Sequence, residues 1–326
     1  MKRFTLMLLP VLFLSLFGCK PQPITETRLV FDTICEITIY NGEQRIITDA
    51  FELCKEYDLI FSKTNPNSQV YRANHANGAT VQIDPRLAEA LQICLYVAEK
   101  SNGAFDPTVC AATDLWDFNN QTIPNSDLLA QAVLTIGYKN ILLGGDTLTL
   151  KDGAMLDLGG VAKGYVADAL ADFLKQQGVE KAIINLGGNI VVFGGTERWR
   201  IGIRKPFEQL ESLAARIHTQ DISAVTSGTY QRFFMQDGTL YHHILNPKTG
   251  TPASTQLDSV TVLAQSSALA DAASTACIVL GLEASMDFIA SLPGTEAVFI
   301  SANGEIATTP GMSPTDNEQL YLEIIN

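Results

Sequence analysis

The sequence has little of what several protein classes require. It contains four histidines in 326 residues, and no two of its six cysteines stand in a C-x-x-C spacing. A histidine-rich metal site is therefore excluded, and a zinc or thioredoxin-like cysteine site finds no support. Basic residues number 22 against 35 acidic ones, for a formal net charge of −13, which argues against a protein that binds nucleic acid or coats an anionic membrane surface. With 46% hydrophobic and 17% charged residues, the chain is too apolar to be disordered and long enough to bury a large core without disulfides.

Long apolar runs are missing too, except at the N-terminus. Lys2 and Arg3 precede an apolar stretch, residues 4–17, that is too short to span a bilayer and is typical of a secretory signal. No later segment has the uninterrupted apolar length of a membrane span, so we expect the rest of the chain to be soluble outside the cytoplasm.

The apolar stretch ends Leu-Phe-Gly-Cys, which resembles a bacterial lipobox with Gly18 at the cleavage site and Cys19 as the lipidated residue. We therefore expect residues 1–18 to be a signal peptide, residues 19–27 a lipidated tether and residues 28–326 one large domain. This organisation predicts a protein on the periplasmic side of a bacterial cell membrane, held there by its lipid alone. An ordinary signal peptide with an incidental cysteine is the alternative.

Helical and strand-like patterns are interspersed along the rest of the chain. Apolar residues at helical spacing predict helices over residues 49–62, 85–101, 163–177 and 267–280. Short runs rich in β-branched residues predict strands over residues 34–40, 181–186, 189–193, 198–204, 222–227 and 296–300. The intervening residues 108–150 look irregular and end in an expected hairpin around Gly144-Gly145-Asp146. Because helices and strands do not alternate in a βαβ rhythm, the pattern favours an α+β fold.

A glycine-containing segment, DLGGVAKGY (157–165), follows an apolar strand and opens a helix. Glycines at such a junction let backbone N–H groups and the helix N-terminus approach an anion, and Lys163 in the first turn adds positive charge. The segment is neither G-x-G-x-x-G nor a Walker loop. A plain strand–helix connection is the alternative.

A helix of small residues carries a pair of oxygen-bearing side chains. Asp271 and Thr275 stand four residues apart and so project from one helix face. Such a pair, completed by carbonyl and phosphate oxygens, suits Mg²⁺, which is usually held by few protein ligands. The alternative is an aspartate that bonds the neighbouring hydroxyl on a solvated face.

Two further segments contain polar side chains at turns. Asp106, in GAFDPT (103–108), follows a helix end and precedes a proline, where a carboxylate can hold the polar edge of a ligand. His242 and His243 end a strand before the turn NPKTG, so one imidazole can face a pocket as a base or phosphate ligand. A histidine that merely caps the turn explains the pattern equally well.

Taken in order, these segments resemble the ApbE family of membrane-anchored bacterial FAD:protein FMN transferases. The matching segments are GAFDPT (103–108), DLGGVAKGY (157–165), INLGGNI (184–190), AVTSGTYQRFF (224–234), HILNPKTG (243–250) and SALADAASTA (267–276). They spread over nearly the whole mature chain. The resemblance implies an α+β domain related to the T-fold, with FAD as substrate and Mg²⁺ as cofactor.

The resemblance also implies roles for individual residues. The expected FAD contacts are Phe31, Ala104, Phe105, Asp106, Asp157, Lys163 and, through its backbone, Leu245. The expected magnesium ligands are the Gly160 carbonyl and the side chains of Asp271 and Thr275, with Ser274 nearby. Phe31 stands where the family usually has a methionine, Asn246 where it has an aspartate, and Thr64 near a position that is tyrosine in some members.

The implied reaction transfers FMN from FAD to a threonine hydroxyl of an acceptor protein and releases AMP. Its catalysis rests on positioning and charge neutralisation, which Mg²⁺, Lys163 and the helix N-terminus would supply. His243 is the expected base that takes the threonine proton, with Asp106 second. The expected acceptors are extracytoplasmic subunits of Na⁺-pumping NADH:quinone oxidoreductases and Rnf-type complexes. A periplasmic FAD pyrophosphatase that forms FMN and AMP, and a flavin-binding lipoprotein without catalysis, are the alternatives.

Overall fold

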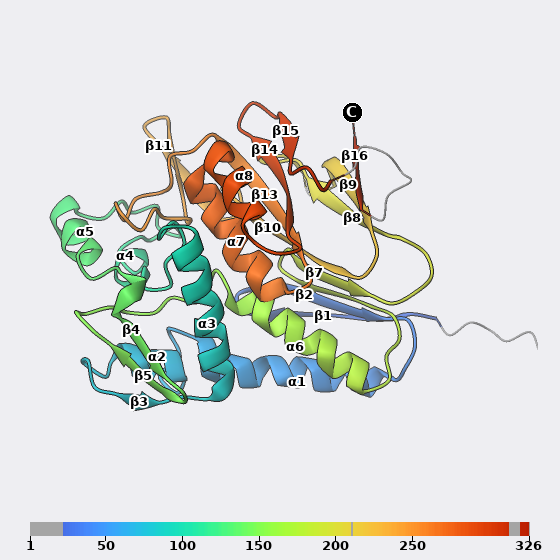
Figure 1. Cartoon of the computed structure of the whole chain (residues 1–326), viewed down its shortest axis with the longest axis horizontal. Helices are drawn as coiled ribbons and strands as arrows, with labels where there is room; N and C mark the ends of the chain where they lie inside the picture. Colours follow the sequence, from blue (N-terminus) through green and yellow to red (C-terminus); the bar gives the residue numbers. More distant parts are fainter. Residues whose placement is uncertain (1–21, 210, 313–319, 326) are drawn as a thin grey trace, which may run out of the picture.

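The computed structural model describes residues 22–209, 211–312 and 320–325 (Figure 1). The predicted signal peptide and Cys19 lie outside the described residues. Part of the expected tether belongs to the sheet, because β1 (Ile24–Val30) pairs over its whole length with β2 (Thr33–Ile39).

An eight-stranded sheet in the order β1-β2-β6-β7-β10-β13-β14-β15 forms the centre of the molecule. All its neighbouring strands are antiparallel. The remaining strands are β6 (Ala182–Leu186), β7 (Asn189–Phe193), β10 (Ile222–Gly228), β13 (Leu257–Ala264), β14 (Glu296–Ser301) and β15 (Ile306–Thr308). This antiparallel arrangement, with helices inserted between strands, agrees with the expected α+β class.

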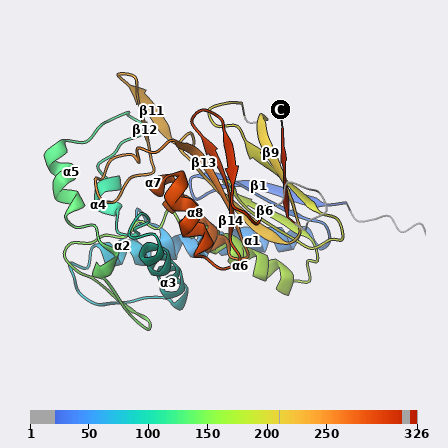
Figure 2. The same cartoon turned by 45° about the horizontal axis from the view of Figure 1, so that its top comes forward.

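The two faces of the sheet are covered differently (Figures 1 and 2). One face packs against helices: α1 (Gln44–Phe61), α6 (Ala162–Gln176), α7 (Ser267–Leu280) and α8 (Leu282–Ala290). On the other face, a smaller sheet buries residues such as Ile201, Ala215 and Ile217 against Val192 and Leu263. That smaller sheet has the order β16-β9-β8 and contains β8 (Trp199–Arg204), β9 (Leu213–Thr219) and β16 (Tyr321–Ile324).

A region of shorter elements lies beside one end of the large sheet, on the left in Figure 1. It contains α2 (Gln69–Asn74), β3 (Val81–Gln82), α3 (Pro85–Lys100), α4 (Cys110–Thr113), α5 (Ser126–Val133), β4 (Ile141–Gly144) and β5 (Thr147–Leu150). The hairpin of β11 (Phe233–Gln236) and β12 (Thr239–His242) extends toward it, and Phe234 packs there with Trp116 and Leu245.

The expectation of irregular structure over residues 108–150 is wrong for α4 and α5, whereas β4 and β5 form the expected hairpin around residues 144–146. The Asn125 side chain accepts hydrogen bonds from the backbone N–H groups of Asp127 and Leu128 and so caps α5. Leu129 is the only residue of α5 that is buried, so the helix lacks the wide apolar stripe that reveals a helix in a sequence.

The cysteines within the described residues, Cys35, Cys54, Cys94, Cys110 and Cys277, are all buried and free. Among the same residues, no helix combines the length and the apolar character that a bilayer span requires.

Candidate active site

A cleft of about 840 Å³ lies where the region of shorter elements meets the large sheet and α7. Ten of the residues expected in the site line it, although they come from segments far apart in the sequence: Ala104, Phe105, Asp106, Asp157, Gly160, Lys163, His243, Leu245, Asp271 and Thr275. The fold therefore brings most of the predicted site together.

The GAFDPT segment enters the cleft because α3 ends abruptly. Asn102 and Gly103 adopt positive φ angles of 50° and 74°, and the Gly103 N–H donates to the carbonyl of Ala98 at 2.8 Å. The Ser101 hydroxyl then accepts a hydrogen bond from the Phe105 N–H at 3.1 Å. These contacts hold Ala104 and Phe105 at the cleft wall.

The Asp106 carboxylate organises the following turn. It accepts hydrogen bonds from the N–H and the hydroxyl of Thr108, at 2.9 and 2.6 Å, and from the N–H of Tyr138 at 2.8 Å. Burial raises the pKa of Asp106 above its usual value, although these donors oppose the rise. Because most of its lone pairs are already occupied, Asp106 mainly holds this turn in place, and its expected roles toward FAD and as a second base remain predictions.

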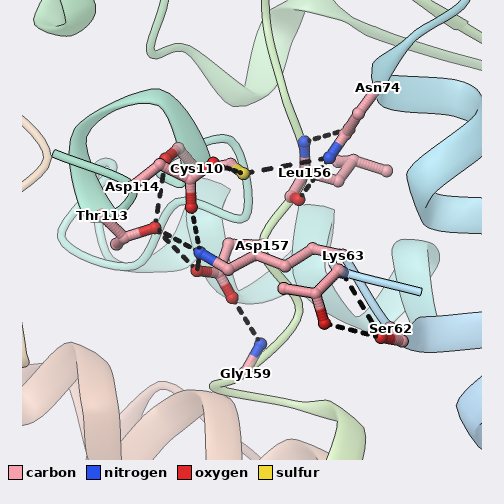
Figure 3. A network of polar contacts seen from close by, with 10 residues as sticks. Ser62, Lys63, Asn74, Cys110, Thr113, Asp114, Leu156, Asp157 and Gly159 are labelled. Atoms are coloured by element: carbon pink, nitrogen blue, oxygen red, sulfur yellow. Dashed lines mark hydrogen bonds and ion pairs between the residues drawn. The ribbon is translucent and has the colours of Figure 1, made fainter. Parts of the chain in front are cut away.

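Asp157 is held by a network that the sequence did not reveal (Figure 3). The Lys63 ammonium donates to Thr113 Oγ1 at 2.9 Å and forms ion pairs with Asp114 at 2.6 Å and Asp157 at 2.9 Å. Thr113 also donates to Asp157 at 2.8 Å, and the Gly159 N–H donates to the other carboxylate oxygen at 3.0 Å. Asp157 thus retains little capacity for a further hydrogen bond, and its position is well defined.

The charges of this network explain two shifted pKa values. Burial opposes the ionisation of Asp157, but the charge and hydrogen bond of Lys63 outweigh it and hold the carboxyl pKa below its ordinary value. Burial likewise opposes the charge of Lys63, but Asp157 and its neighbours raise the Lys63 pKa. In the sequence, Lys63 is one lysine in a turn, FSKTNPNS, and nothing local indicates its partner 94 residues away in DLGGVAKGY.

The residues expected to hold magnesium converge at the start of α6. The two helices α6 and α7 touch closely there, and the Gly164 N–H donates to one carboxylate oxygen of Asp271 at 2.9 Å. A Cβ placed on Gly160 would lie 3.3 Å from the Thr275 hydroxyl and 3.1 Å from the Phe105 ring, so the loop backbone contacts both. This set of carboxylate, hydroxyl and carbonyl oxygens fits Mg²⁺ completed by phosphate oxygens. Among the described residues, no cluster of three or more histidine, cysteine or acidic side chains offers another metal site.

Two predicted site residues are not among those that line the cleft. The buried Ser274 hydroxyl donates to the Asp271 carbonyl at 3.0 Å and lies 2.8 Å from the Ser227 hydroxyl. Phe31 occupies the turn between β1 and β2, with φ at 53°, and packs against the main core. Their expected roles toward metal and FAD remain predictions.

The adjacent histidines have different surroundings. His242 is buried, with Nε2 3.0 Å from the Ala253 carbonyl and Nδ1 accepting from the Ile244 N–H, so it stabilises the turn. His243 lines the cleft, and its Nδ1 lies 3.3 Å from the Arg232 carbonyl oxygen. Because a carbonyl can only accept, we assign the proton of the neutral ring to Nδ1, which leaves the Nε2 lone pair available. Burial, followed by His242 and Lys163, lowers the pKa of His243 to about 4.

Asn189 lines the cleft but is not among the site residues expected from the sequence. Its side chain is buried, and the amide nitrogen Nδ2 has no hydrogen-bond partner among the described residues. A buried donor without a partner costs roughly 1–3 kcal/mol, so it favours a ligand that supplies an acceptor. Its place in the segment INLGGNI is the signal that could have identified it.

Comparison with known proteins agrees with this geometry. The ApbE family model matches residues 31–299, more than three quarters of the chain. The chain belongs to the ApbE family.

Several relatives of this ApbE-family chain share the name FAD:protein FMN transferase. The FAD:protein FMN transferase of Treponema pallidum is 34% identical over 320 residues, which cover 90% of this chain and 88% of that protein. The FAD:protein FMN transferase of Klebsiella pneumoniae is 34% identical over 277 residues, which cover 83% of this chain and 86% of that protein.

Solved ApbE structures also superpose well. The ApbE protein of Thermotoga maritima aligns with a TM-score of 0.81 and 29% identity over 89% of this chain and 97% of that one. The flavin transferase ApbE of Vibrio cholerae aligns with a TM-score of 0.80 and 25% identity over the same shares. These matches confirm that the chain forms one α+β domain of the ApbE type.

The other two departures from the ApbE pattern, at Asn246 and Thr64, lie in turns. The Asn246 amide oxygen accepts from the Lys248 N–H at 2.9 Å, so an uncharged side chain suffices to shape this turn. Thr64 is exposed and lies 3.3 Å from the Ser62 hydroxyl, outside the residues that line the cleft.

Proposed function

We propose that this ApbE-family chain transfers FMN from FAD to a threonine hydroxyl of an acceptor protein and releases AMP. The observation that carries the proposal is one cleft that is lined by Gly160, Asp271 and Thr275 together with Lys163 and His243. This arrangement combines a place for a hard divalent ion, a fixed positive charge and a neutral imidazole. The names of the most similar relatives support the same activity.

The cleft can bind the diphosphate of FAD through several groups. Lys163 stands in the first turn of α6, where the positive end of the helix dipole favours an anion. Its ammonium donates to the Gly159 carbonyl at 3.1 Å, which holds it over the loop. Mg²⁺ bound by Gly160, Asp271 and Thr275 would neutralise charge that develops on the phosphates.

The transfer step requires one bond to form and another to break. The threonine oxygen attacks the phosphorus of the FMN phosphate, and the bond from that phosphorus to the AMP phosphate oxygen breaks. Neutral His243 accepts the hydroxyl proton at Nε2, and AMP leaves with the electron pair. Because Lys163 contributes to the low pKa of His243, binding of the anionic diphosphate beside Lys163 would raise that pKa and make the imidazole a stronger base.

Mass spectrometry of the acceptor provides the test. The full-length protein in detergent is incubated with FAD, Mg²⁺ and an extracytoplasmic domain of an Rnf-type subunit. We expect a mass gain of one FMN on the acceptor threonine, and AMP release that is much faster with the acceptor than without it. Asp271→Asn, or EDTA, is expected to abolish both. Equal AMP release with and without acceptor, and no mass gain, would identify an FAD pyrophosphatase instead.

We also propose that a lipid on Cys19 keeps the enzyme at the periplasmic face of the membrane. Its acceptors, subunits of Na⁺-pumping NADH:quinone oxidoreductases or Rnf-type complexes, are membrane-bound as well. A tether confines both partners to one surface and so raises their effective concentration.

A further inference from the structure

A second, larger cleft adjoins the first. It measures about 1900 Å³, part of which is open to solvent, and it shares Gly187, Thr226 and Gln231 with the catalytic cleft. The shared wall is fixed, because the Gln231 amide donates to the Thr226 carbonyl at 3.0 Å. A molecule in this second cleft, which we call the side groove, therefore lies next to the catalytic cleft, with these shared residues at the boundary.

The shared wall also borders the proposed metal site. Ser227, which follows Thr226 in β10, has its hydroxyl 3.3 Å from the Thr275 hydroxyl. A group that enters along this wall from the side groove arrives beside the residues proposed to hold the diphosphate. The side groove is thus placed to deliver a nucleophile to the phosphorus.

Exposed apolar side chains surround the side groove. Phe207 and Phe233 are 47% and 40% exposed, and Ile34 is 68% exposed. The Phe207 ring lies 5.1 Å from the Phe233 ring and 6.0 Å from the Tyr230 ring, both edge-on. Clustered exposed aromatic residues are typical of a protein-binding surface, since isolated folded proteins rarely expose them together.

The charge of the side groove differs from that of the whole protein. Arg204 and Lys205 line it together with Glu208, in a chain of formal net charge −13. Neither cation forms an ion pair with any residue that the structure describes, and the Arg204 guanidinium lies 5.9 Å from the centre of the Tyr230 ring. An occupant with a carboxylate would complement this local positive charge.

The backbone beside the side groove can accommodate an extended chain. β8 contributes Gly202 and Arg204, and it is the terminal strand of the order β16-β9-β8. One edge of β8 therefore has no strand partner among the described residues, and such an edge can pair with an added strand.

We propose that the side groove binds an extended, negatively charged segment of the acceptor protein and presents its threonine to the catalytic cleft. This inference rests on the proposed transferase function. The aromatic residues Phe207, Tyr230 and Phe233 contact apolar side chains of the segment, and Arg204 and Lys205 contact its carboxylates.

The test compares variants of the side groove with a matched variant elsewhere. Phe207→Ser and Phe233→Ser remove the aromatic contacts, and Arg204→Glu reverses the charge. Leu134→Ser is the control, because Leu134 is 82% exposed and belongs to neither cleft. The probe is the Rnf-type extracytoplasmic domain, used intact for FMN transfer and with its acceptor threonine changed to valine for equilibrium binding.

We expect each side-groove variant to raise the acceptor KM, and to weaken binding of the valine-substituted acceptor, about tenfold, as hot-spot residues do. FAD affinity and AMP release without acceptor should stay within about twofold of the wild-type values. The wild-type acceptor KM should rise with salt, and that dependence should weaken in Arg204→Glu.

The outcomes separate this inference from the proposed function. If wild type transfers FMN but the variants keep its acceptor KM, the side groove does not bind the acceptor. Weakened FAD binding in the variants would assign the groove to the flavin and overturn the inference. If wild type binds the acceptor through the groove but transfers no FMN, the transferase function fails and the docking surface stands.

Discussion

At the scale of single residues, Lys63 shows how one buried charge determines the geometry of a site. Its ammonium forms ion pairs with Asp114 and Asp157 and connects the turn after α1 to the loop before α6. Removing one partner of a largely buried ion pair leaves the other without a counter-charge, which costs more than the pair itself contributes.

Lys63→Met is therefore expected to destabilise the fold by about 3 kcal/mol at pH 7 and to weaken FAD binding, because Asp157 loses its anchor. The folded pKa of Asp157 lies below its ordinary value, so its contribution to stability is present above about pH 3.9 and is lost as the pH falls through the folded pKa. The difference in Tm between wild type and variant should therefore shrink in acid. Thermal unfolding from pH 3 to 8 measures this.

Lys55→Met serves as the control for this experiment. Lys55 pairs with Glu52 at 2.8 Å on the surface, with 67% of its side chain exposed, so its loss should cost less than about 1 kcal/mol. A Lys63 variant as stable as this control would contradict the role assigned to the network.

His243 is the residue whose charge state controls the proposed proton transfer. His243→Ala should lower the rate of FMN transfer about 10²–10⁴-fold while FAD affinity stays nearly unchanged. Because the pKa of His243 is lowered to about 4, the ring is neutral at and above pH 5. The wild-type kcat/KM for FAD should therefore be level from pH 8 to 5 and fall toward pH 4. If His243→Ala shows the same fall of kcat/KM toward pH 4 as wild type, or loses only FAD affinity, then His243 has a structural role.

At the scale of elements, close packing of α6 on α7 positions Asp271. A Cβ on Gly164 would lie 2.3 Å from the carbonyl oxygen of Ser267, a contact that backbone cannot absorb. Asp168 adds a second link, since its carboxylate accepts from the N–H groups of Ser267 and Ala268 at the start of α7. The position of the Asp271 side chain relative to the loop at Gly160 therefore depends on the packing of α6 on α7.

Gly164→Ala is expected to destabilise the protein by about 1–3 kcal/mol, although alanine favours a helix more than glycine by about 1 kcal/mol. Mg²⁺-dependent FAD turnover should fall as well, because the Gly164 N–H that orients Asp271 moves. Thermal unfolding and AMP release measure the two effects. Gln176→Ala, at an exposed position of the same helix, is the control and should change neither. If Gly164→Ala unfolds at the same temperature as wild type, then α6 and α7 are packed less tightly than described.

Secondary structure could be predicted where the local pattern was strong. Residues 267–280 form α7 as expected, and the helix expected from residue 85 begins at Pro85, where the Asp84 side chain caps it. By contrast, the helix expected from residue 49 begins earlier, because α1 starts at Gln44. Glu43, which precedes it, makes no capping hydrogen bond through its side chain, so no capping residue marks this start in the sequence. Element types follow from periodicity, whereas boundaries without a cap do not.

At the scale of the whole molecule, the region of shorter elements lies beside one end of the large sheet (Figure 2), and residues of both regions and of α7 line the cleft. The side groove lies next to it, between the sheet and the β8–β9 hairpin. FAD and the acceptor can therefore reach the proposed reaction centre from adjoining sides.

Membrane attachment is the prediction that belongs to this scale. Cys19→Ala should release the protein from the membrane fraction or block its processing, because the acyl chains supply most of the membrane affinity in a lipid-anchored protein. Fractionation and intact-mass analysis measure this. Cys35→Ala, at a buried thiol inside the fold, is the control for cysteine loss. A wild-type protein without acyl mass on Cys19, and an unchanged distribution of the variant, would contradict the anchor.

The α+β class, the family and the helix boundaries at Gly103 and at the start of α6 follow from the sequence, because they depend on neighbours within a few residues. The sequence also singled out Asp157, Lys163, His243 and Asp271, which line one cleft, since each stands in a short segment with a recognisable pattern. The folded structure was needed to show which imidazole faces the cleft, that Lys63 holds Asp157, and that Asn189 presents a donor without a partner among the described residues. These facts depend on contacts between segments tens of residues apart, and no local pattern encodes which distant side chains meet.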